Sequence, residues 1–167
     1  MMKYTVYNED EIADFLKFTK IMETQNSKNM KKLLSVQNKI PILSGIDPLD
    51  IQAIIYDLKF LKVQHLESIV KEGDNTREIF FILSGECGVF VKNNQVNTLK
   101  KGDSFGESAS IFQTQRDATV VCTSEEVTLL SFSIDHDNLE FCAVALAKMY
   151  KNLAFQINAK LEKMNSN

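Results

Sequence analysis

The sequence predicts an α+β protein with a mainly β core, in which an antiparallel sandwich or barrel lies between helical ends. Three observations lead to this prediction. Short β-branched and aromatic runs recur through the middle of the chain, and each ends in turn residues such as Gly73-Asp74. An apolar pattern with helical spacing precedes these runs, and a longer one follows them. At 167 residues, the chain is long enough for one domain with a buried core.

Residues 1–40 are predicted to be an N-terminal helical segment. Asn8 and Glu11 have the spacing of a capping box at a helix start. Apolar side chains then recur at helical spacing, and the polar stretch 25–31 is expected to be a turn or a bend. A second helical piece follows and is expected to end at Pro41. We expect this segment to pack on the barrel or on a partner chain.

Residues 41–134 are predicted to form the β core. A short helix comes first, because Asp47 is a good N-cap and Pro48 suits the first helical position. From Phe60 onward the apolar spacing approaches two, as in strands. The pair Asn93-Asn94 predicts a two-residue hairpin turn, since asparagine tolerates positive φ.

Residues 135–167 are predicted to form the C-terminal helix, with Asp135 and Asp137 able to cap its start. An apolar stripe then recurs at three- and four-residue steps: Leu146, Tyr150, Leu153, Ile157, Leu161 and Met164, with Met149 beside it. A stripe of this length favours the seam of a homodimer. The alternative is a helix that folds back on its own barrel.

Composition and charge argue against several classes of function. The formal net charge of −3 gives no general attraction to nucleic acid or to an anionic membrane, so we expect neither as a partner. Three cysteines, odd in number and widely spaced, predict buried reduced thiols. The N-terminus lacks the apolar core of a signal peptide, and the longest apolar run, 79–83, is too short to span a bilayer. We therefore expect a cytoplasmic protein.

The stretch 102–120 carries the chemistry of the predicted site. Gly106 lets the backbone adopt positive φ or approach a ligand closely, and Glu107 follows it directly. Residues 108–112 can form a short helix whose first N–H groups suit an anion. Arg116 adds a planar fork of donors suited to phosphate, and Glu107 can accept from a sugar hydroxyl. This arrangement predicts a pocket for a phosphate joined to a sugar.

Two motifs in this stretch, Phe105-Gly106-Glu107-Ser108-Ala109 and Arg116-Asp117-Ala118-Thr119-Val120, lie nine residues apart when counted from Glu107 to Arg116. They resemble the phosphate-binding cassette of the cyclic nucleotide-binding domain family, which includes catabolite-activator proteins and protein kinase A regulatory subunits. The likeness extends over about residues 40–134, through motifs such as Lys71-Glu72-Gly73-Asp74. It implies a jelly-roll β-barrel that binds cAMP or cGMP.

The resemblance also implies roles for individual residues. Arg116 would bind the exocyclic oxygens of the cyclic phosphate, and Glu107 would accept a hydrogen bond from the ribose 2′-hydroxyl. Val89 and Val96 would line the base pocket, although either could equally belong to the core. The full predicted ligand-binding set is Gly106, Glu107, Ser108, Ala109, Arg116, Asp117, Ala118, Val89 and Val96. No metal and no cofactor is implied.

Asp117 departs from the family, which usually has Ala, Ser or Thr directly after the arginine. A carboxylate about 5 Å from a phosphate would cost on the order of 3 kcal/mol at an effective dielectric near 20. Three interpretations remain open. Asp117 points to solvent or pairs with Arg116; it accepts from guanine N–H groups, since cGMP-selective members use a threonine here; or the barrel has lost nucleotide binding. Ser108 and Gln115 are milder departures.

The residues do not favour an enzyme. A cupin-type metal centre needs clustered imidazoles, and the chain has only His65 and His136. The cysteines, Cys87, Cys122 and Cys142, lack the neighbours of a catalytic thiol. No helix-turn-helix follows the terminal helix, so DNA recognition is not expected.

We therefore expect a cyclic nucleotide sensor that acts through its C-terminal helix on a homodimer partner or a separate effector protein. Two alternatives remain: a degenerate barrel that only mediates protein association, and a binding module for another small anion.

Overall fold

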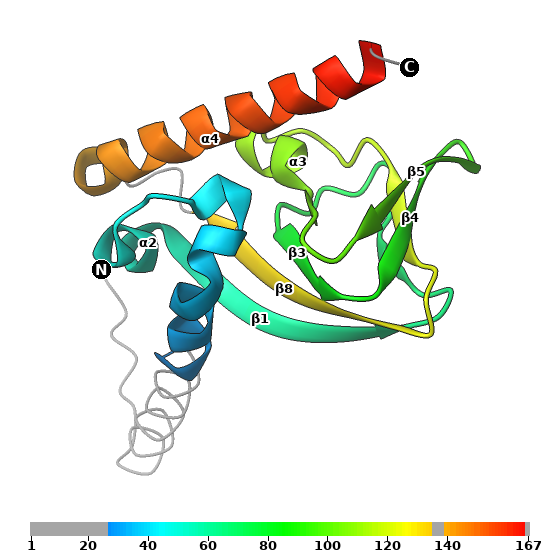
Figure 1. Ribbon diagram of the computed structural model, residues 1–167, viewed down its shortest axis with the longest axis horizontal. Coiled ribbons are helices and arrows are strands. Elements are labelled where there is room, and N and C mark those ends of the chain that lie inside the picture. Colours follow the sequence, from blue (N-terminus) through cyan, green and yellow to red (C-terminus); the bar gives the residue numbers. More distant parts are fainter. Residues whose placement is uncertain (1–26, 135–138, 166–167) are drawn as a thin grey trace, which may run out of the picture.

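The computed structural model describes residues 27–134 and 139–165. Two antiparallel four-stranded sheets form the β core, and the helices gather at one end and along one side of it (Figure 1). The predicted α+β architecture, a jelly-roll barrel with flanking helices, is confirmed. The helix predicted from Asn8 and the caps predicted at Asp135 and Asp137 lie outside the described residues.

The strands pair in the orders β1-β8-β3-β6 and β2-β7-β4-β5. Their bounds are β1 Ile55–Gln64, β2 Ser68–Val70, β3 Ile79–Ser84, β4 Glu86–Val91, β5 Asn94–Lys100, β6 Ser104–Phe105, β7 Thr119–Cys122 and β8 Glu126–Ile134. The helical elements are residues 27–36, the 3-10 turns η1 Gln37–Lys39 and η2 Pro41–Leu43, and the α-helices α2 Pro48–Ile54, α3 Glu107–Ile111 and α4 Leu139–Asn165.

The helix predicted to start at Asp47 is confirmed as α2. The Asp47 side chain accepts from the Leu49 N–H at 2.9 Å, and Pro48 occupies the first helical position. Two neighbouring predictions were wrong. The polar stretch at 27–31 is helical, and the helix ends at residue 36. Pro41 starts η2 instead of ending the helix, because proline is accommodated in the first turn, where its missing N–H costs no bond.

The hairpin between β4 and β5 turns one residue earlier than predicted. Lys92 and Asn93, with φ of 48° and 66°, are the central residues, and Val91 pairs with Asn94. A register shift between Val89 and Phe90 follows, so that Val89 pairs with Asn97. Because side chains alternate between the faces of a strand, this register decides which β5 residues face the barrel interior.

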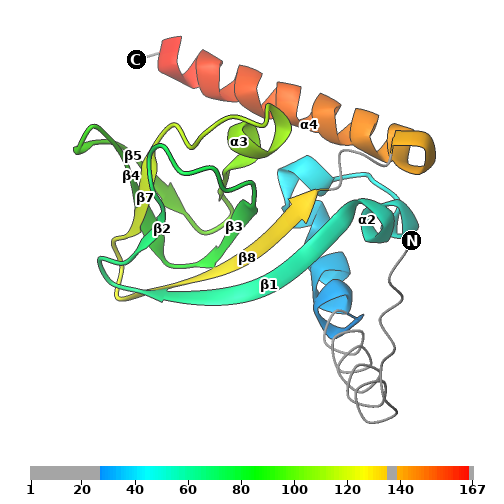
Figure 2. The same cartoon turned by 180° about the vertical axis from the view of Figure 1, so that it is seen from behind.

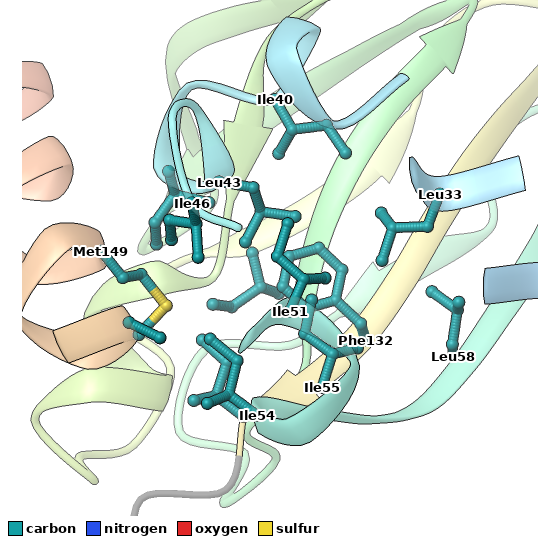
Figure 3. Packing of buried hydrophobic residues seen from close by; sticks show 14 of the residues in the cluster. Leu33, Ile40, Leu43, Ile46, Ile51, Ile54, Ile55, Leu58, Phe132 and Met149 are labelled. Atoms are coloured by element: carbon teal, nitrogen blue, oxygen red, sulfur yellow. The ribbon is translucent and has the colours of Figure 1, made fainter. Parts of the chain in front are cut away.

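Two hydrophobic clusters lie on opposite sides of the sheet that contains β3 and β8. The first joins the helices to this sheet and includes Leu33, Ile51, Phe132 and Met149 (Figure 3). The second lies between the two sheets and includes Ile82. Consecutive residues of β3 contribute to different clusters, which explains the unbroken apolar run at 79–83.

α4 packs along α2 and past α3, as both views show (Figure 1, Figure 2). Its residues Ala145, Leu146, Met149 and Leu153 are buried. The Asn152 Nδ2 donates to Ile42 O at 3.2 Å and to Ser44 O at 2.8 Å, which ties the helix to η2. The first part of the predicted dimer stripe is therefore used within the chain, as in the fold-back alternative.

Two of the three cysteines are buried without a disulfide, as predicted. Cys87 and Cys122 face each other across β4 and β7, and burial, with a smaller effect of Cys122, raises the pKa of the Cys87 thiol to about 12. The side chain of Cys142 lies outside the described residues.

The described residues contain neither a membrane-spanning helix nor a cluster of metal-ligating side chains. No helix among them combines the length and apolar character needed to cross a bilayer. In the same part of the chain, no three His, Cys, Asp or Glu side chains gather as a metal site would require. His65 is exposed, with Nδ1 3.0 Å from Ser124 O, and His136 falls outside the described ranges.

Candidate functional site

A cavity of about 220 Å³ lies between the β2-β7-β4-β5 sheet and the segment that carries α3. Its wall is formed by Val70, Val89, Asn97, Leu99, Ser104, Phe105, Gly106, Glu107, Ser108, Ala109, Arg116, Asp117, Ala118 and Val120. The structure therefore brings together all the predicted ligand-binding residues except Val96. The ligand contacts themselves stay predictions.

Val96 lies outside the cavity, and its side chain is 60% exposed. The reason is the hairpin register: Asn97, which pairs directly with Val89, shares the inner face with it, and Val96 points away. The β5 residues on the cavity wall are Asn97 and Leu99. The prediction that Val96 lines the pocket is therefore wrong, and its neighbour Asn97 lies on the cavity wall instead.

Arg116 is buried, with only 4% of its surface exposed. Its Nε donates to Thr76 Oγ1 at 2.9 Å, and its Nη1 donates to Gly106 O at 3.2 Å. Its Nη2 donates to Glu78 O at 2.8 Å and forms an ion pair with Glu78 Oε2 at 3.3 Å. Phe80 lies under the guanidinium, with the ring centroid 5.7 Å from Cζ.

These contacts leave one N–H of Arg116 without a hydrogen-bond partner among the described residues. A guanidinium has five N–H donors, and the contacts within the described part of the chain use four of them. The remaining donor is on Nη1. Burial lowers the pKa of Arg116 while Glu78 opposes that effect, and an arginine remains charged in either case. The wall of the cavity therefore holds a fixed cation.

Gly106 is required by the way Arg116 packs. Its φ of 90° lies in the left-handed region, and it is the N-cap of α3. A Cβ at this position would lie 2.6 Å from Arg116 Nη1 and 2.6 Å from Glu78 O. Any side chain would therefore displace both the guanidinium and the Glu78 carbonyl, which directly precedes β3.

At the start of α3, the first backbone N–H groups have no hydrogen-bond partner within residues 27–134 and 139–165. The first helical hydrogen bond runs from the Ser110 N–H to Gly106 O, so the N–H groups of Glu107, Ser108 and Ala109 precede it. All three residues line the cavity. These donors and Arg116 make this end of the cavity favourable for an anion.

Glu107 is buried, with 6% of its surface exposed, and one of its oxygens, Oε1, accepts from the Ser104 hydroxyl. Ser104 lies on β6 and also lines the cavity. Among the described residues, Oε2 has no hydrogen-bond partner, so Glu107 can accept another hydroxyl from the cavity. An oriented acceptor beside an anion-binding end suits a sugar attached to a phosphate.

Asp117 lines the cavity but remains exposed, and the ion pair of Arg116 is formed with Glu78. The pairing of Asp117 with Arg116, which the sequence left open, is therefore not formed. Asn97 lies on the same wall and is exposed, and its Oδ1 accepts from the Thr98 N–H at 2.8 Å. Asp117 and Asn97 thus supply an acceptor and a donor beyond the anion-binding end.

Sequence reasoning missed Thr76 and Glu78, the residues that hold Arg116. They lie 40 and 38 residues before it in the chain, and no motif connects them to it. The only feature of the sequence that could have indicated them is their position just before the apolar run of β3.

Comparison with known proteins gives a consistent result. Residues 61–140 match the family model described as the cyclic nucleotide-binding domain. The cGMP-dependent protein kinase of Plasmodium berghei is 35% identical over 86 residues, which cover 52% of this chain and 10% of the kinase. The cAMP-dependent protein kinase regulatory subunit of Hypocrea atroviridis is 30% identical over 112 residues, 67% of this chain and 24% of the subunit. The chain thus spans at most about a quarter of these relatives.

Solved structures show the same fold at lower identity. PfPKA-R with bound cAMP superposes with a TM-score of 0.64 and 22% identity, covering 89% of this chain and 51% of that one. The catabolite activator protein of Thermus thermophilus superposes with a TM-score of 0.56 and 19% identity, covering 75% and 60% of the two chains.

Proposed function

Because this chain contains a domain of the cyclic nucleotide-binding family, we propose that it is a regulatory module that binds cAMP or cGMP in the cavity beside α3. One observation carries the proposal: the buried Arg116, the buried Glu107 and the other first residues of α3 all line one cavity. A cation with backbone donors suits a phosphate, and a neighbouring carboxylate suits a ribose hydroxyl. No catalytic step is needed for this role.

In this proposal, the cyclic phosphate contacts the free Nη1 donor of Arg116 and the first N–H groups of α3. The ribose lies against Glu107, which Ser104 orients. The base extends toward β4 and β5, where Val89 and Leu99 offer apolar contact. Asp117 lies at the mouth and is free to accept from guanine N–H groups, which would favour cGMP over cAMP.

Isothermal calorimetry with cAMP, cGMP and inorganic phosphate tests the proposal. We expect heat with at least one cyclic nucleotide and a large loss in Arg116→Ala, since truncating one partner of a buried charge contact costs roughly 2–5 kcal/mol. Lys62→Ala is a matched control, because it removes a cation whose ion pair with Glu126 is exposed on the barrel surface. No heat with either nucleotide would favour the association module, and heat with phosphate alone would favour a module for another anion.

We also propose that α4 transmits the signal, to a second copy of the chain or to a separate effector. Leu146, Met149 and Leu153 are occupied within the chain, so this contact would use the other side, where Val144 and Phe155 are 67% and 65% exposed. Light scattering during size-exclusion chromatography distinguishes the two partners. A monomer at high concentration, with and without nucleotide, would leave only the separate effector. The unpaired buried thiols Cys87 and Cys122 support a cytoplasmic location, which stays part of the proposal.

A further inference from the structure

Arg77 holds the segment between α3 and Arg116 through two backbone carbonyl groups of that segment. Its Nη1 donates to Thr114 O at 2.6 Å, and its Nη2 donates to Gln113 O at 3.0 Å. A third, longer bond reaches Thr76 O at 3.3 Å. The planar fork of a guanidinium fits two successive carbonyl groups in a way that a lysine ammonium does not.

The segment that Arg77 holds has little else to fix it. α3 ends at Ile111, and Gln113 has a φ of 52°, which is unfavourable for a residue other than glycine. Residues 113–115 are exposed. Within the described part of the chain, residues 113–115 receive only these two hydrogen bonds, both from Arg77.

Three consecutive residues act on the two ends of this segment. Thr76 and Glu78 hold the guanidinium of Arg116, and Arg77 between them holds the carbonyls of Gln113 and Thr114. The Arg77 charge is also close enough to Arg116 to lower its pKa, an effect smaller than those of burial and Glu78. Residues 76–78 therefore connect Arg116 and the end of α3 to the same point on the barrel.

We propose that Arg77 is a positioning residue of the anion site, whose bonds to Gln113 and Thr114 set the place of the α3 N–H groups relative to Arg116. Arg77 is not among the residues that line the cavity, so it acts through the segment that it holds. The inference rests on the proposed binding of a cyclic nucleotide for its effect on affinity, but its effect on the segment does not require a ligand.

The first test is amide hydrogen exchange, followed by NMR, in the ligand-free protein. The Phe112 N–H bonds to Ser108 O and the Arg116 N–H bonds to Asp74 O, so these two amides report on either end of the segment. In Arg77→Gln, we expect both to exchange about tenfold faster, which corresponds to about 1.4 kcal/mol. The Ile82 amide of β3, which bonds to Asp103 O, serves as an internal reference that does not change.

The second test is calorimetry with cAMP and cGMP on Arg77→Gln, Arg77→Lys and the control Lys71→Gln. Lys71 is an exposed cation on the same connection between β2 and β3, and its side chain makes no hydrogen bond to the described residues. We expect the affinity of Arg77→Gln to fall about tenfold, Arg77→Lys to recover little of it, and the control to bind like the wild type.

Unchanged exchange at Phe112 and Arg116 in Arg77→Gln would overturn the inference, as would full recovery by Arg77→Lys, which would show that only the charge matters. If the wild type binds no nucleotide, the proposed function fails, while the exchange measurement still decides whether Arg77 holds the segment.

Discussion

Gly106→Ala tests whether the guanidinium of Arg116 needs a backbone without a side chain beside it. The new Cβ would lie 2.6 Å from both Arg116 Nη1 and Glu78 O, whereas ordinary contact begins at 3.4 Å. Both groups, or the backbone of residue 106 itself, would therefore have to shift by about 0.8 Å. This shift would stretch or break the 3.2 Å bond from Nη1 to Gly106 O.

The cost of this change has two parts. A left-handed φ of 90° costs a residue with a Cβ roughly 1–2 kcal/mol. Overpacking against a buried group adds roughly 1–3 kcal/mol. A loss of roughly 2–5 kcal/mol lowers the melting temperature of a chain of this size by roughly 5–15 °C. Because Arg116 is displaced, affinity for cyclic nucleotide should also fall at least about tenfold.

Gly102→Ala is the matched control for this experiment. Gly102 has a φ of 96°, but a Cβ there would meet nothing within 4 Å. It should therefore lose only the roughly 1–2 kcal/mol of backbone strain and keep its affinity. Differential scanning fluorimetry and calorimetry measure the two quantities. If the two variants melt and bind alike, the close contact of Gly106 with Arg116 does not matter and the reasoning is refuted.

Three further predictions concern other parts of the molecule. Asp117→Ala should tighten cAMP binding several-fold, because an exposed carboxylate at the cavity mouth repels the phosphate. The same change should weaken cGMP binding if Asp117 accepts from guanine. Equal tightening of both nucleotides in calorimetry would show that Asp117 acts only by repulsion. Folding keeps the Cys87 thiol neutral by raising its pKa from 9.0 to about 12, so stability should fall as pH rises through that range. Urea midpoints measure this, and Cys87→Ala should flatten the decline. Met149→Ala should cost roughly 2–5 kcal/mol in urea unfolding, since Met149 is fully buried in the first cluster; a loss below about 1 kcal/mol would contradict tight packing of α4.

The cassette could be predicted from the sequence because its parts are close along the chain. Gly106, Glu107 and Arg116 lie within eleven residues, and local rules for glycine, helix starts and arginine indicate how each is used. The start of α2 at Asp47 and Pro48 followed the same kind of local rule and is confirmed. Patterns of this kind need no knowledge of tertiary contacts.

The remainder depends on contacts between distant residues. The family resemblance implies that Val96 lines the base pocket, but the register of the hairpin puts Asn97 opposite Val89. Because a shift of one residue exchanges the two faces of a strand, the side chain of Val96 lies on the other face of β5. The acceptors that hold Arg116 come from the lead-in to β3, and no spacing rule connects them to the cassette. The apolar stripe of α4 could be predicted from its spacing. The sequence of the helix alone does not predict whether α2 or a second chain covers that stripe.

Phe80 and Phe81 are neighbours on β3, yet they belong to different halves of the molecule. Phe80 stacks on Phe105 and lies under the Arg116 guanidinium, while Phe81 belongs to the cluster with Met149 of α4. One peptide unit thus separates the residue that lies under the Arg116 guanidinium from a residue of the cluster that packs against the terminal helix. Substitutions in this strand will change ligand affinity and helix docking together, whereas Leu99 and Met149 allow each to be altered separately.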